Sequence, residues 1–305
     1  MQTEQSLKIP CRLYDFGWAL GLELKRLLTS RRWIPVLIVL SLGAIKATDQ
    51  LVRYSHVIRK SSNLWDSYFA FYGSWSNQYL SLVVPILFIL LVGDILIKDT
   101  SSGYSQLVLV RMNNKGTFWF SKCVAIFVVA LCFSFVIFLL AILSGVVRGL
   151  PFSLSLSPLA LSMQAPDLNT MAHWNVIDAV IHPFVHPVSP LLHSGIIIST
   201  VSMAYTLLAL IGVVLGIYAT TFFAPLAMIV FTQIIIQNYG LFMPSAKLIS
   251  IVIYFINMVT DSAFRNSPFS EKTMALSQQA VLGINSFAIA CLVLIGWIFY
   301  RRKEY

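Results

Sequence analysis

The side chains best suited to metal binding or acid–base chemistry gather in one polar stretch of the second half of the chain. They are His173, Asp178, His182 and His186. The spacing of the last two histidines suits two metal ligands on one face of a helix. A proline follows each of these two residues, however, and proline disfavours helical backbone at the preceding position. We therefore interpret the stretch as a stiff loop near the lipid headgroups, and a membrane-embedded enzyme that uses this cluster is the weaker alternative.

The sequence lacks the common motifs for nucleotide or ester hydrolysis. The dipeptide Gly-Lys does not occur, so there is no phosphate-binding loop of the GxxxxGK[ST] type. The HExxH and GxSxG patterns are also missing, which removes the simplest zinc-protease and serine-hydrolase interpretations. We expect no catalytic residue and no metal site on this chain.

Polar residues within the apolar runs are few, and one group of them stands out. Gln233 and Gln237 lie one helical turn apart and Asn238 follows. These side chains could line a translocation path, but hydrogen bonds between helices explain them equally well. Lys46 and Asp49, three residues apart, could pair at the end of the first apolar run. The scarcity of charges argues against a secondary transporter, which would place coupling residues near the membrane midplane.

The polar segment 98–122 is the most informative part of the sequence. It offers acidic residues near its start, a Ser-Ser-Gly break, a stretch able to form a short helix, and basic residues toward its end. Such a segment could dock a cytosolic partner, although a plain connecting loop is the common alternative. The candidate docking residues are Asp94, Asp99, Gly103, Gln106, Arg111, Lys115 and Lys122.

The composition predicts the kind of structure that positions the candidate residues, namely helices within a membrane. Of the 305 residues, 58% are hydrophobic and 11% are charged, which excludes a water-soluble domain. Six apolar runs are long enough to cross the hydrocarbon core of a bilayer. The sequence therefore predicts an all-α integral membrane protein of one transmembrane domain with six transmembrane helices, at 33–51, 80–97, 124–147, 192–218, 222–243 and 281–300.

Other segments are expected to lie at the membrane surface. Residues 12–29 form an amphipathic pattern, with Glu23, Lys25 and Arg26 on the polar face, and predict an interfacial helix. The apolar stretch 248–259 is too short to span and predicts an outward re-entrant or interfacial helix before the last span. Seven aromatic residues between 65 and 79 are dense enough for an outer aromatic belt, with a stacking surface for an amphiphilic substrate as the alternative.

The net charge of +9 is explained by membrane topology and by contact with anionic lipids. The basic residues sit at the ends of apolar runs instead of forming one patch, so we expect no nucleic-acid partner. Lys and Arg are densest before the first run, between the second and third, and after the sixth. The positive-inside rule then places both termini in the cytoplasm, and we expect a multi-pass protein of a bacterial cell membrane.

This arrangement resembles the permease subunit of type 2 ABC exporters. Members of that family often have an acidic residue at the end of span two, then a second acidic residue or glycine, a short helix, a basic residue, and a lysine entering span three. Those positions are matched here by Asp94, Asp99, Gly103, Leu107 to Arg111, Lys115 and Lys122.

The resemblance implies a function and a set of partners. Residues 12–29 would be the elbow helix, and 98–122 would contain the coupling helix that docks on a separate cytosolic ABC ATPase. ATP and Mg²⁺ would bind to that partner, with no cofactor on this chain. A second permease chain, identical or a sister subunit, would complete an exporter of an amphiphilic substrate such as a peptide antibiotic, a lipid-linked molecule or a drug, working by alternating access.

Overall fold

The described part of the chain is built from α-helices. The computed structural model describes residues 8–73, 77–92, 95, 104, 108, 110, 114–155, 157–159, 189–217 and 278–302, and these residues contain no strand. The helices are α1 (Lys8–Leu28), α2 (Trp33–Ile58), α3 (Leu64–Gly73), α4 (Asn77–Val92), α7 (Lys115–Val147), α10 (Pro190–Gly216) and α13 (Gln278–Arg302).

Three of these helices are long and apolar enough to cross a membrane, which indicates a membrane protein. They are the stretches Trp33–Val57, Lys115–Val147 and Pro190–Gly216. The shorter apolar helix Val83–Val92 lies within the predicted second span, and α13 covers the predicted sixth. The predicted fifth span, 222–243, and the stretch 248–259 lie outside the described residues.

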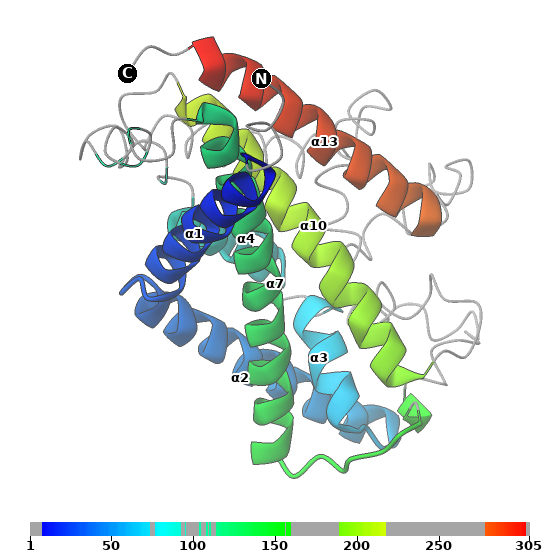
Figure 1. Ribbon diagram of the computed structural model, residues 1–305. Coiled ribbons are helices and arrows are strands. Elements are labelled where there is room, and N and C mark those ends of the chain that lie inside the picture. The colour runs from blue at the N-terminus through cyan, green and yellow to red at the C-terminus, as the bar shows by residue number, and fades with distance from the viewer. Residues whose placement is uncertain are drawn as a thin grey trace, which may run out of the picture.

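Helix α7 organises the described structure. It packs against each of the other six described helices, and Figure 1 shows it running through the middle, with α2 on one side and α10 and α13 on the other. One of its faces is buried in the core, while Val124, Phe127, Phe135 and Leu139 are exposed at helical spacing on another. An apolar stripe of this kind on a spanning helix suits contact with lipid chains.

The beginning of α7 corrects the predicted boundary of the polar segment 98–122. The helix begins at Lys115, nine residues before the predicted start of the third span at Val124. Asn114 caps it, because its side-chain oxygen accepts hydrogen bonds from the backbone N–H groups of Gly116 (2.9 Å) and Thr117 (3.4 Å). Hydropathy alone missed this first part of the helix because it contains polar residues. Since the helix begins at Lys115, the polar loop before it extends no further than Asn114.

Helix α3 corrects the interpretation of the aromatic stretch. Trp65, Tyr68, Phe69 and Phe71 are buried instead of forming an exposed belt or a stacking surface. The side chains of the other three aromatic residues of the stretch, Tyr72, Trp75 and Tyr79, lie outside the described part of the structure. The ring of Tyr68 meets Phe138 of α7 edge-on, with the ring centroids 5.0 Å apart. The segment after α7 packs against α3, since the indole N–H of Trp65 donates to the carbonyl of Ser153 at 2.6 Å. These aromatic side chains therefore fill the space between helices.

The start of α3 is fixed by a reciprocal pair of side-chain caps. The side-chain oxygen of Asn63 accepts from the backbone N–H groups of Trp65 (3.1 Å) and Asp66 (3.3 Å). A carboxylate oxygen of Asp66 in turn accepts from the backbone N–H of Asn63 at 2.9 Å. This is a capping box with a shorter acidic residue at the third position. Burial raises the pKa of Asp66 to about 6, against the opposing effect of hydrogen bonds from Ser157 and from the Asn63 backbone.

Substitution of Asp66 by asparagine is expected to change how stability depends on pH. Because the folded-state pKa is raised from 3.8 to about 6, the folded protein binds the proton more tightly, and the free energy of unfolding falls as pH rises through this window. Above pH 6 the free energy of unfolding is lower by about 3 kcal/mol than it is below the unfolded-state pKa of 3.8. Asp66→Asn keeps an oxygen for the cap and removes the charge, so thermal unfolding at pH 7.5 should shift upward and lose its dependence on pH between 4 and 6. An unchanged pH dependence would show that Asp66 does not titrate in this range.

Candidate functional site

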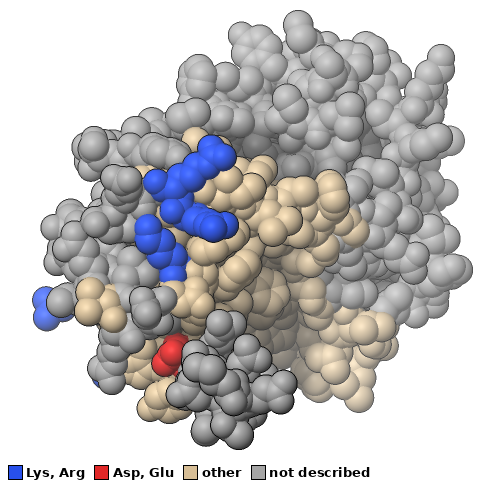
Figure 2. All heavy atoms as spheres, turned by 45° about the horizontal axis from the view of Figure 1, so that its top comes forward, with Lys and Arg blue, Asp and Glu red and all other residues tan. Residues whose placement is uncertain are grey.

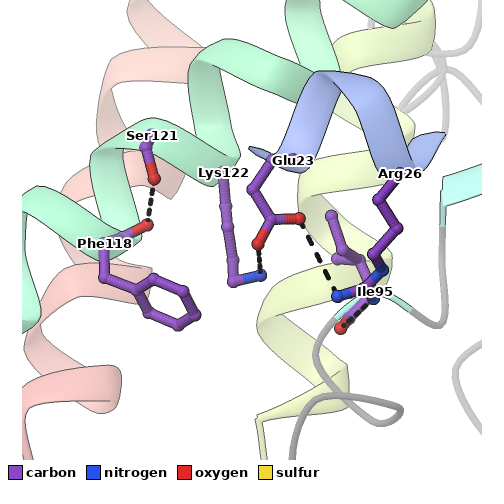
Figure 3. A network of polar contacts seen from close by, with 6 residues as sticks. All are labelled: Glu23, Arg26, Ile95, Phe118, Ser121 and Lys122. Atoms are coloured by element: carbon purple, nitrogen blue, oxygen red, sulfur yellow. Dashed lines mark hydrogen bonds and ion pairs between the residues drawn. The ribbon is translucent and has the colours of Figure 1, made fainter. Parts of the chain in front are cut away.

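A buried ion pair joins the first helix to the central one. Glu23 of α1 and Lys122 of α7 meet with 2.6 Å between the carboxylate Oε1 and the lysine Nζ. Their side chains are 1% and 0% exposed. Figure 3 shows the two side chains pointing toward each other from neighbouring helices. The pair fastens α1 to α7 at a point where both helices are otherwise packed through apolar surface.

This placement corrects two sequence-based interpretations. Glu23 was expected on the polar face of an interfacial helix, and Lys122 was expected on an exposed docking surface. Both side chains are buried, and the cost of burying each charge is offset by the opposite charge of its partner. The signal that could have found the pair is the position of Lys122 inside a strongly apolar segment, since a charge in such surroundings requires a partner.

The immediate surroundings of the pair are aromatic. The Lys122 ammonium lies 4.4 Å from the ring centroid of Phe118, one turn earlier on α7, and 6.0 Å from that of Tyr104. The faces of these rings attract a cation and help to offset its loss of hydration. A buried ion pair still carries a large desolvation cost, so its main effect is to make the contact specific: neither partner can be removed without leaving an unpaired charge.

A second cation connects the pair to the chain that follows α4. Arg26 lies one turn after Glu23 on α1, and its Nη2 donates to the carbonyl of Ile95 at 3.3 Å. Its guanidinium lies 5.1 Å from the ring centroid of Tyr104. We call Glu23, Arg26 and Lys122 the charge cluster. Through Arg26 the cluster contacts Ile95, near the end of the predicted second span, and Tyr104, within the predicted docking segment. Lys122, which the sequence placed at the end of that segment, belongs to α7.

The corner between α1 and α2 packs against the middle of α7, where the ring centroids of Trp33 and Phe133 lie 6.2 Å apart. An Nη1 donor of Arg32 reaches the carbonyl of Leu90, near the end of α4, at 2.6 Å, and the Trp33 indole N–H donates to the carbonyl of Leu27 at 3.0 Å. The end of α13 lies against the first turns of α7, because the ring of Tyr300 stacks on Trp119 with 5.6 Å between centroids.

Basic side chains form a patch on one face of the described structure. Figure 2, which brings the top of Figure 1 forward, shows Lys and Arg side chains gathered over part of this face. Of the basic residues in α1, in the corner before α2 and at the end of α13, Lys25, Arg31, Arg301 and Arg302 are exposed. A basic patch on a membrane protein suits contact with anionic lipid headgroups.

The opposite end of α7 is held by a different set of contacts. Arg148, which caps α7, pairs with Asp49 of α2 at 2.5 Å, so Asp49 does not serve Lys46 as its partner in the way the sequence suggested. The hydroxyl groups of Thr48 and Ser144 lie 2.5 Å apart between the same two helices. Small hydroxyl side chains are typical of close helix packing in membranes, where they form hydrogen bonds across the interface.

Most other candidate residues fall in parts of the chain that are not described. Lys115 is the first residue of α7 and is half-buried. No metal-binding group of three or more His, Cys, Asp or Glu is present within the described ranges. The remaining docking candidates Asp94, Asp99, Gly103, Gln106 and Arg111, the polar residues Gln233, Gln237 and Asn238, and the cluster around His182 lie outside the described residues.

Comparison with known proteins assigns no family to the chain: no family model matches it, and no curated protein matches it. The functional proposal therefore rests on the helix arrangement, on the charge cluster and on the resemblance noted in the sequence.

Proposed function

We propose that the chain is the permease subunit of an ATP-driven exporter that moves an amphiphilic substrate across or out of the membrane. The observation that carries this proposal is the charge cluster. It links an N-terminal helix, the chain after α4 and the start of a long apolar helix through specific polar contacts. A subunit driven by a separate ATPase needs such a link between its docking segment and its spans.

The proposed mechanism is alternating access driven from the cytoplasmic side. Two permease chains sit on two ATPase subunits, which bind ATP and Mg²⁺, and the segment between Asp94 and Asn114 docks on the ATPase. Closure of the ATPases on ATP displaces this segment, and Arg26 passes the displacement to α1 while Lys122 passes it to α7. The nucleotide shifts the populations of inward-open and outward-open states only as far as its affinity for them differs.

The amphiphilic character of the substrate is inferred from α7, α10 and α13. Helix α2 differs, because it carries Lys46, Asp49 and Arg53, of which Asp49 pairs with Arg148. No Asp, Glu, Lys or Arg occurs in α7 after Lys122, in α10, or in α13 before Arg301. A carrier driven by protons or ions would place ionisable side chains at that depth. A path lined by apolar groups, hydroxyls and amides such as Gln233 and Gln237 instead suits a peptide antibiotic, a lipid-linked molecule or a drug.

Charge reversal at Arg111 is expected to separate ATP hydrolysis from transport. In inverted membrane vesicles that hold the chain and its ATPase, Arg111→Glu should reduce ATP-dependent uptake of a fluorescent amphiphile at least tenfold, because a docking cation becomes an anion, while ATP hydrolysis continues. Arg53→Glu, an exposed position of α2 away from the proposed docking end, is the matched control and should leave uptake unchanged. Equal uptake by both variants would argue against this segment as the docking element.

A further inference from the structure

Two basic side chains at the bend between α1 and α2 have no partner within the described structure. Lys25 lies in the last turn of α1, and Arg31 lies in the corner just before α2 begins; both are exposed. Their neighbours Arg26 and Arg32 donate to backbone carbonyl groups around the end of α4, whereas the side chains of Lys25 and Arg31 make no hydrogen bond or ion pair with described residues. Figure 1 shows this bend on the side of α7 away from α10 and α13.

The acidic residues nearest to these cations along the chain already have partners. The sequence contains no Asp or Glu between Glu23 and Asp49. Glu23 is buried against Lys122, and Asp49 pairs with Arg148 farther along α2. Exposed cations that lack a counter-ion attract anions from outside the chain.

A stripe of exposed apolar side chains on α2 begins directly after Arg31. Ile34, Ile38 and Leu42 are each more than half exposed and follow one another at intervals of four residues, so they share one face of the helix. The stripe ends near Lys46, which is exposed. Arg31 and Lys46 lie about 22 Å apart along a helix of this length. Because long basic side chains extend outward toward the headgroups, this spacing fits a hydrocarbon core of about 30 Å.

We propose that an anionic phospholipid binds at this bend, with its phosphate at Lys25 and Arg31 and an acyl chain along Ile34, Ile38 and Leu42. Exposed cations alone attract any anion, and an apolar helix face alone contacts any lipid chain. A basic group directly beside an apolar stripe instead matches a ligand that carries an anionic head and an apolar tail in one molecule. The inference requires only that α2 lies in the membrane, and it holds whichever activity the chain has.

Titration with two lipids tests the headgroup part of the proposal. The full chain in a non-ionic detergent is titrated with phosphatidylglycerol or with phosphatidylcholine of the same acyl chains, and the affinity for the first bound lipid is measured by native mass spectrometry. Phosphatidylglycerol should bind more tightly, and Arg31→Gln and Lys25→Gln should each weaken its binding about fivefold. Arg53→Gln, at another exposed arginine of α2, is the matched control and should leave it unchanged. Equal binding of the two lipids by the unmodified chain, or equal binding of phosphatidylglycerol by Arg31→Gln and Arg53→Gln, would overturn the proposal.

A second pair of variants tests the position of the acyl chain. Ile38 and Val57 are both exposed on α2, but only Ile38 belongs to the stripe. Because neither side chain is buried, both serine variants should fold. Ile38→Ser should weaken phosphatidylglycerol binding about fivefold through lost apolar contact, while Val57→Ser should leave it unchanged. Equal affinities of these two variants would overturn the proposal.

Discussion

Lys122→Met is expected to destabilise the protein by about 3–5 kcal/mol, because it leaves the Glu23 carboxylate buried and unpaired. Glu23 is 1% exposed, and its Oε1 would lose the only hydrogen bond that the carboxylate makes with described residues. Arg26 could recover part of the loss by turning toward Glu23, which places the expected value at the lower end of the range.

The double substitution Glu23→Leu with Lys122→Met separates a lost charge partner from lost packing. Because replacement of both members of a buried pair by apolar residues is often close to neutral, the double variant should regain most of the melting temperature that the single variant loses. Lys25 is an exposed lysine of α1, so Lys25→Met is the control and should change the melting temperature little. A double variant as unstable as Lys122→Met alone would show that the pair is not what holds α1 to α7.

Gly296→Ala is expected to disturb the packing of α13 on α7 and α10. A Cβ at this position would lie 2.3 Å and 2.6 Å from atoms of the Trp119 ring and 2.9 Å from the side chain of Val214. Trp119 cannot easily move away, because its ring is fully buried and stacked on Tyr300 and its indole N–H donates to the carbonyl of Val293 at 3.0 Å. Forcing a methyl group into this space should cost about 1–3 kcal/mol.

Gly283 on the same helix provides the matched control for Gly296. A Cβ at Gly283 would meet nothing within 4 Å, so Gly283→Ala should leave stability unchanged or raise it by up to about 1 kcal/mol through helix propensity. The two variants can be compared by thermal unfolding in the same detergent or nanodisc. A Gly296→Ala variant as stable as Gly283→Ala would mean that α13 does not approach α7 as closely as the structure shows.

The helices were predictable from the sequence because apolar runs of sufficient length must be helical in a membrane. The spans proposed at 33–51, 124–147 and 192–218 all lie on helices that are long and apolar enough to cross it, except for residue 218, which is outside the described residues. Boundaries were less accurate. Asn114 caps α7 well before its apolar part begins, and hydropathy does not detect a capping side chain.

Side-chain partners across helices were not predictable, because they depend on which helices become neighbours. Helical periodicity placed Glu23 among polar residues, yet α7 approaches α1 on that side and buries it. Asp49 finds its partner in Arg148, about a hundred positions away, instead of in the nearby Lys46. The aromatic side chains of α3 would suit a membrane interface equally well by composition, and only the contact with α7 shows that they are core residues.

The proposed role of this chain as the membrane subunit of an ATP-driven exporter can be tested by identifying the proteins that purify with it. The full chain should be isolated from its native membrane in a mild detergent and its partners identified by mass spectrometry. We predict a Walker-motif ATPase in a ratio of about one to each permease chain. Repeated purification of the folded chain without any such ATPase would contradict the account.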